Sequence, residues 1–245
     1  MLVQKCMREA GFEYTIEPAD PVPGARDFPY VLDDIEWAGQ HGYGSDIQRA
    51  TDEWTKNNPN TRYLQSLSAQ RRKSAAAALN GPVPQGLTAR TPDGVTFTHS
   101  DRGCESTARR RLYGDLPAWY QAKTAVAALA DMTVAAVKAD QAFTSSVTVW
   151  SACMTAAGTP YETPDRVRET LPPPDRPWPV AEEKRLAVTE ATCAINSGLA
   201  RTAKELGARH RALLEEKYRD DVTTKKRLQR QALPRARAVT DDANQ

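Results

Sequence analysis

Two similar cysteine-containing segments constrain this chain more than any other feature of its sequence. Residues 6–11 and residues 153–158 both read Cys-Met-x-x-Ala-Gly. An aromatic residue stands eight positions after each cysteine, and a proline follows it. The pattern predicts a helix that carries an inward-facing cysteine near its end, is stopped by the glycine and continues as an extended segment.

Each repeat is followed by one more cysteine on a segment that we expect to be helical, Cys104 after the first and Cys193 after the second. The repeat therefore favours the disulfides Cys6–Cys104 and Cys153–Cys193 among the three connectivities that four cysteines allow. Chain entropy would then contribute about 4 to 5 kcal/mol for each loop, less any strain. Two alternatives stay open: the four cysteines are free buried thiols, or the repeat is a chance match between short helix ends.

Large apolar side chains are scarce in the sequence. Leu, Ile, Val and Phe together number 40 of the 245 residues, whereas alanine alone numbers 37. This share lies below the roughly 20% under which chains tend to be disordered, but disorder also requires a high net charge. The formal net charge is only +2. We therefore expect alanine-rich helices that pack closely and are stapled by disulfides.

The hydrophobic pattern predicts a mainly α fold. Two long helices, over residues 116–157 and 180–233, are expected to form an antiparallel hairpin of the coiled-coil type. The one strand-like stretch, residues 86–99, contains a Thr-Pro-Asp-Gly turn and predicts a small β-hairpin. We expect an N-terminal helical lobe over residues 1–114, the helical hairpin over 115–233 and a flexible tail over 234–245, because Pro234 should end the last helix.

The sequence contains no recognisable catalytic or metal-binding pattern. The three histidines lie far apart, and neither a GxSxG motif nor a glycine-rich phosphate loop is present. We therefore predict no catalytic residue, no metal site and no cofactor. The possible binding residues are His41 and Tyr43 in a Gly-rich turn, with Trp119 and Tyr120 early in a helix. For each of them, an ordinary turn or core position is the simpler interpretation.

A basic segment precedes the end of the chain. Its members between residues 225 and 237 are Lys225, Lys226, Arg227, Arg230, Arg235 and Arg237, with no acidic residue among them. The segment could attach the protein to anionic envelope polymers, lipids or nucleic acid. The simpler interpretation is a solvated helix end whose cations lie near the negative end of the helix dipole.

Several short motifs spread over most of residues 1–215 carry a family resemblance. They are Trp150-Ser151-Ala152-Cys153-Met154 before Gly158, His41-Gly42-Tyr43-Gly44, Ala77-Ala78-Leu79-Asn80-Gly81, Gly103-Cys104-Glu105, Arg109-Arg110-Arg111-Leu112-Tyr113-Gly114 and Ala191-Thr192-Cys193. With these motifs the chain resembles a large group of secreted proteins and lipoproteins of actinobacteria, many of them from streptomycetes. The resemblance implies export, usually lipid anchoring through an upstream cysteine, and paired cysteines. It brings no established activity.

The expected location follows from that resemblance. No apolar run reaches the roughly 18 residues of a membrane span. The first residues show neither a lipoprotein motif nor a charged leader before an apolar run, so we expect the export signal to be absent from this sequence. We expect an extracytoplasmic protein, secreted or at the cell surface, for which nucleic acid is an unlikely partner.

The functional expectation is a non-enzymatic binding or scaffolding protein of the bacterial cell envelope, with a protein or an envelope polymer as its partner. Two alternatives stay open. One is a secreted hydrolase with a site near His41, and the other is a secreted effector or toxin component that acts through its long helices. The ligand and the oligomeric state are not specified by the sequence.

Overall fold

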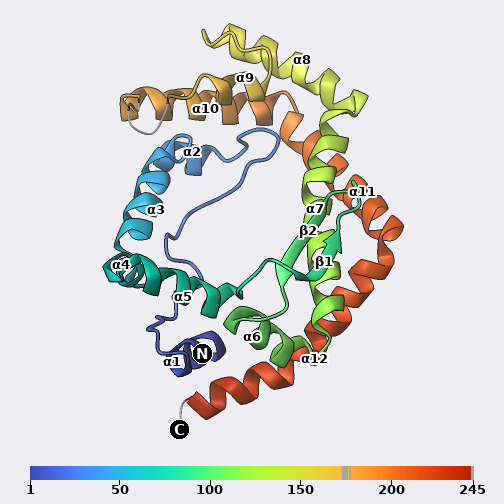
Figure 1. Ribbon diagram of the computed structural model, residues 1–245. Helices are drawn as coiled ribbons and strands as arrows, with labels where there is room; N and C mark the ends of the chain where they lie inside the picture. Colours follow the sequence, from blue (N-terminus) through green and yellow to red (C-terminus); the bar gives the residue numbers. More distant parts are fainter. Residues whose placement is uncertain (173–175, 177, 244–245) are drawn as a thin grey trace. The chain divides into compact units, whose positions relative to one another are not determined.

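The computed structural model describes residues 1–172, 176 and 178–243, and this part of the chain is mainly helical (Figure 1). The predicted mainly α fold with one small β-hairpin is confirmed. In chain order the elements are α1 (Leu2–Glu9), α2 (Ile35–His41), α3 (Ser45–Asn57), α4 (Pro59–Ser66), α5 (Ala69–Asn80), β1 (Gly86–Arg90), β2 (Thr96–Ser100), α6 (Cys104–Tyr113), α7 (Leu116–Lys138), α8 (Gln141–Ala156), α9 (Pro164–Glu169), α10 (Val180–Asn196), α11 (Leu199–Lys217) and α12 (Arg219–Ala243).

The chain forms two compact units, each assembled from segments that are distant in the sequence. Unit 1 comprises Met1–Ala19, Thr55–Ala130 and Leu214–Gln245, and unit 2 comprises Asp20–Trp54 and Asp131–Leu213. This division differs from the consecutive regions expected from the sequence. The reason is tertiary packing: α12 packs on α6 within unit 1, and α10 packs on α2 within unit 2.

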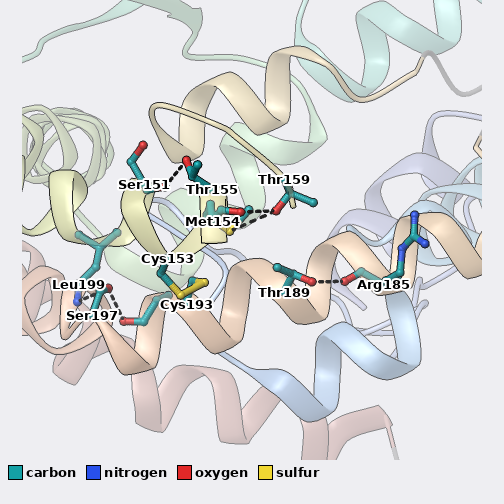
Figure 2. The surroundings of a disulfide bond; sticks show 11 residues. Ser151, Cys153, Met154, Thr155, Thr159, Arg185, Thr189, Cys193, Ser197 and Leu199 are labelled. Atoms are coloured by element: carbon teal, nitrogen blue, oxygen red, sulfur yellow. Dashed lines mark hydrogen bonds between the residues drawn. A yellow bond between two sulfur atoms is a disulfide. The ribbon is translucent and has the colours of Figure 1, made fainter. Parts of the chain in front are cut away.

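The two disulfides have the connectivity that the repeat predicts. Cys6–Cys104 joins α1 to α6 in unit 1, and Cys153–Cys193 joins α8 to α10 in unit 2 (Figure 2). The repeat also has the same backbone structure twice. In each copy the residue after the glycine donates its N–H to the carbonyl oxygen of the methionine, over 2.9 Å. This hydrogen bond closes a Schellman helix end, in which the glycine adopts a left-handed conformation.

The β-hairpin of unit 1 follows the expected turn. β1 and β2 pair antiparallel, with Gly86 opposite Ser100 and Arg90 opposite Thr96. Leu87 of β1 is buried against side chains of α7 and α12. These partners are Leu116, Trp119 and Leu228. The hairpin therefore covers the place where the beginning of α7 packs near α12.

The two long helices expected from the sequence are each divided. In the first, α7 ends at Lys138, and the Asp140 side chain caps α8 by accepting the Ala142 N–H over 3.0 Å. In the second, Gly198 adopts φ +78° between α10 and α11. A capping carboxylate and a left-handed glycine both supply local hydrogen bonds that compete with a continuous helix. Each of the two expected long helices is therefore a series of shorter helices.

The expected flexible tail is also different in the structure. Pro234 lies inside α12, which continues to Ala243. A proline removes one helical hydrogen bond and strains the preceding turn. Tertiary contacts offset this cost, because α12 packs on α6 and Arg235 donates a hydrogen bond to the Leu112 carbonyl over 2.8 Å. Residues 244–245 of that tail lie outside the described residues.

Close packing through alanine occurs where α10 meets α2 in unit 2 (Figure 1). Ala38 of α2 is fully buried with Ala187 and Ala191 of α10. Small side chains let two helix backbones approach closely without a large apolar core. This contact brings the end of α2 against α10 and so positions the turn that follows α2.

Candidate functional site

A tight turn between α2 and α3 forms one wall of the candidate site in unit 2. Gly42 and Gly44 both have positive φ, +63° and +88°. A Cβ atom at Gly42 would lie 2.7 Å from the side chain of Glu183, and one at Gly44 would lie 3.3 Å from the ring of Trp37. The Gly-Tyr-Gly sequence therefore allows the backbone to pass directly over these two side chains.

The carboxylate of Glu183, on α10, accepts hydrogen bonds from this turn. Glu183 is only 6% exposed. Its Oε1 accepts the backbone N–H of Tyr43 over 2.8 Å, and its Oε2 accepts the hydroxyl of Ser45 over 2.5 Å. The Ser45 N–H also points to Oε1, at 3.3 Å. A buried carboxylate needs such donors, and here they come from a turn about 140 residues earlier in the chain.

Glu190, two helical turns further along α10, is completely buried. Its Oε2 accepts a hydrogen bond from the Tyr43 hydroxyl over 2.6 Å, and its Oε1 accepts one from the Leu32 N–H over 3.0 Å. The Arg168 guanidinium lies 3.9 Å from Oε1. Burial raises the pKa of Glu190, while the Tyr43 hydroxyl, the Arg168 charge and the Leu32 N–H oppose that rise. The carboxylate thus fixes the ring of Tyr43 from the side opposite its backbone.

Tyr43 is accordingly a neutral hydrogen-bond donor. Burial raises the pKa of its hydroxyl far above the ordinary value of 10.0, and the charge of Glu190 raises it further. A hydroxyl with so high a pKa does not ionise at physiological pH, so its proton stays available to Glu190. The two glutamates therefore act together to orient one tyrosine, by its backbone and by its hydroxyl.

A cavity of about 250 Å³ lies against this turn, entirely within unit 2. Its walls combine two aromatic rings, two apolar side chains and several polar groups: Tyr43, Trp178, Leu171, Pro172, Gly44, Ser45, Gln48, Arg49 and Glu183. The Arg49 guanidinium donates to the Ser45 hydroxyl over 3.2 Å, which places its charge at the cavity wall. The cavity offers aromatic faces together with hydrogen-bonding groups.

His41 precedes the turn but does not line the cavity. Its Nδ1 lies 2.8 Å from Asp46 Oδ2, and its ring packs against that of Trp37, with 5.2 Å between the ring centroids. Burial acts to raise the pKa of Asp46, but the hydrogen bonds from His41 and from the Ile47 N–H outweigh it and lower the pKa. Asp46 is the only hydrogen-bond partner of the His41 ring among the described residues.

The other two binding candidates belong to unit 1. Trp119 is 7% exposed and stacks on Tyr113, with 3.5 Å between the ring centroids and 9° between the planes. Tyr120 is half-buried, and its ring centroid lies 6.0 Å from that of His99. Trp119 is therefore a core residue. The four candidates are divided between the units, His41 and Tyr43 in unit 2, Trp119 and Tyr120 in unit 1.

The predicted basic segment lies on α12 of unit 1. Lys226 and Arg230 are exposed and line a groove with Leu233, while Arg227 contacts Gln231 over 3.5 Å. Lys225 is half-buried. Lys225, Lys226, Arg227 and Arg230 lie well inside the helix rather than at its end, since α12 continues for 13 residues beyond Arg230.

Glu183 and Glu190 were not identified from the sequence. A sign of their role was present: the buried face of α10 is otherwise apolar, with Leu186 three residues after Glu183 and Ala187 three residues before Glu190. Acidic residues at such spacing on an apolar face require buried donors. Nothing in the sequence indicated that the donors come from the turn after α2.

In the described part of the chain, no cluster of His, Cys, Asp and Glu could hold a metal ion. No helix there is long and apolar enough to cross a membrane. No protein-family model, curated protein or solved structure matches the chain. The candidate site therefore rests on its geometry.

Proposed function

We propose that the protein is a non-enzymatic binding protein of the bacterial cell envelope, located outside the cytoplasm, and that the cavity beside Tyr43 holds its ligand. One observation carries the proposal: two buried carboxylates orient residues of the cavity wall. Glu183 accepts hydrogen bonds from Tyr43 and Ser45, and Glu190 accepts the Tyr43 hydroxyl. Such preorganisation reduces the entropy lost when a ligand binds.

The cavity favours a ligand with one apolar face and a polar edge. At about 250 Å³ it is smaller than the roughly 300–1,000 Å³ typical of drug-sized ligands. The rings of Trp178 and Tyr43 suit the C–H face of a sugar ring, and Gln48, Arg49 and Ser45 can hydrogen-bond its hydroxyl and carbonyl oxygens. We infer that the ligand held in this cavity is a single sugar unit of an envelope polysaccharide.

The two disulfides support a location outside the cytoplasm, since structural disulfides persist in oxidising compartments. A hydrolase is the less favoured alternative. A His–Asp pair is present, but His41 does not line the cavity, and Nε2 lies close to Gly24. A catalytic histidine needs a nucleophile or water within hydrogen-bond reach of that nitrogen.

Binding of β-1,4-linked N-acetylglucosamine oligomers, measured by isothermal titration calorimetry, tests the proposal. We expect W178A to weaken binding by at least about tenfold, since it removes an aromatic anchor. R49Q should weaken it as well. The matched control is R201Q, which removes an exposed guanidinium from α11 of the same unit. Each variant is first checked for an unchanged circular dichroism spectrum.

Unchanged affinity in W178A, or no binding of any oligomer, would contradict the proposed ligand site. Chromatography of the protein after incubation with the same oligomers tests whether it is a hydrolase instead. If the wild type released shorter sugars and H41A did not, the proposed binding function would be wrong and a hydrolase would be favoured.

A further inference from the structure

The near-neutral net charge of the chain conceals a strong difference between its two units. Unit 1 contains 21 Lys and Arg residues against 13 Asp and Glu residues, a formal charge of +8. Unit 2 contains 12 against 18, a formal charge of −6. A unit of such positive charge attracts polyanions at long range. The excess of positive charge belongs to unit 1, whereas the proposed ligand cavity belongs to unit 2, so the two features are separate observations.

Part of this charge converges on a cleft beside α1. The cleft has a volume of about 350 Å³, and Lys5 and Arg8 of α1 line it together with Arg111 of α6. Lys5 and Arg8 are three residues apart, so they lie on the same face of the helix. Among the described residues, none of these three side chains is paired with a carboxylate or a carbonyl oxygen. Their charges are therefore available to a ligand.

A second cleft, of about 590 Å³, shares Arg8 with the first. Arg71 supplies its other cation. The Arg71 guanidinium lies over the Phe12 ring, 5.2 Å from its centroid, and donates to the Gly11 carbonyl over 3.1 Å. Glu13 is the one acidic residue in the lining. Arg8 thus lines two neighbouring clefts, and each cleft is lined by at least one further positively charged side chain.

We propose that these two clefts bind successive phosphate groups of a linear phosphate-bearing polymer that carries no bases. Guanidinium groups bind phosphate oxygens through paired hydrogen bonds, which suits Arg8 and Arg111 to this role. Two clefts with one arginine in common match a ligand whose anionic groups repeat along a chain.

The aromatic residues of the second cleft argue against nucleic acid. Proteins that bind single strands through their bases offer exposed aromatic faces for stacking. Here Phe12 is 9% exposed and covered by Arg71. Tyr14 and Tyr63 are half-buried and pack against the core that surrounds the first disulfide. The surface therefore offers charge without a free stacking platform.

Fluorescence anisotropy with labelled long-chain inorganic polyphosphate tests the proposal, with the full chain and its disulfides intact. The decisive variant is R8Q/R111Q, and the matched control is K226Q/R230Q, which removes two exposed charges from α12 of the same unit. We expect the first to weaken binding by at least about tenfold and the control by less than about threefold. The slope of log K against log salt should fall by roughly 1.4–1.8 in the first variant, for two lost phosphate contacts.

Circular dichroism melts and thiol counts establish that both variants are folded. Equal losses in the two variants would overturn the proposal, because they would indicate a diffuse field rather than the clefts. A larger loss in K226Q/R230Q would overturn it in favour of α12. Tighter binding of a single-stranded oligonucleotide, binding only to anionic lipid vesicles, or no binding of polyphosphate would each overturn it too.

Discussion

Replacing Tyr43 by phenylalanine removes the hydroxyl that holds the buried carboxylate of Glu190. The hydroxyl donates over 2.6 Å, and Glu190 is 0% exposed, so solvent does not reach the carboxylate. A hydrogen bond to a charged group contributes about 1.5–3 kcal/mol, and a buried acceptor left without its donor is costly. The Leu32 N–H and the Arg168 charge remain in place. We therefore expect Y43F to lower the free energy of unfolding by about 2–3 kcal/mol near neutral pH.

The cost of Y43F should decrease as the pH is lowered. Burial raises the pKa of Glu190 above 4.5, so this group contributes stability below pH 4.5 that is lost as the pH rises through its folded pKa. The Tyr43 hydroxyl limits this loss because it stabilises the charged form. Without it the folded pKa rises further. Wild type and variant should thus differ most above the folded pKa and least below pH 4.5.

Urea denaturation of the oxidised protein, followed by circular dichroism at several pH values, measures this difference. Y30F is the matched control, since the Tyr30 hydroxyl has no hydrogen-bond partner among the described residues. We expect the control to cost less than about 0.5 kcal/mol, as is usual away from such contacts. The reasoning would be refuted by a similarly small cost for Y43F at neutral pH, or by a cost that grows as the pH falls.

Gly42→Ala should lower the melting temperature at least about 2 °C more than Gly158→Ala, which corresponds to roughly 1 kcal/mol for a protein of this size. Both glycines have positive φ, but a Cβ at Gly42 would lie 2.7 Å from a carboxylate whereas one at Gly158 meets nothing within 4 Å; equal melting temperatures would contradict this. Arg168→Met removes the cation 3.9 Å from Glu190, so it should raise the pKa of that carboxyl and cost about 1–2 kcal/mol above it, and less in acid. Urea denaturation at two pH values measures the cost, and a loss independent of pH would count against the assigned charge. Alkylation in denaturant should find no free thiol before reduction and four after it, and a free thiol in the oxidised protein would disprove the pairing.

The candidate site was only partly accessible from the sequence. The Gly-Tyr-Gly turn drew attention to His41 and Tyr43 because glycines in such a pattern indicate unusual backbone conformations. The partner carboxylates, Glu183 and Glu190, lie 140 and 147 residues away in the chain. No local pattern specifies which turn a buried carboxylate will meet. Trp119 was equally prominent in the sequence, but its packing on Tyr113 makes it part of a core.

Helix ends also differ in whether the sequence alone predicts them. The end at Gly158 could be predicted because the hydrogen bond that closes it joins residues only five apart. The end at Pro234 was predicted wrongly, because the contacts that carry α12 through the proline come from α6, more than 100 residues earlier. A local rule holds until a distant contact of similar energy opposes it.

The sequence by itself predicted the helical class and the β-hairpin turn and favoured the cysteine connectivity, since each depends on short-range geometry or on a repeat that is visible along the chain. Only the tertiary structure decided which segments form each unit, which acidic side chains are buried and where unpaired cations gather. Burial and electrostatic environment depend on neighbours from other parts of the chain. For this reason the cavity of unit 2 and the charged clefts of unit 1 became visible only in three dimensions.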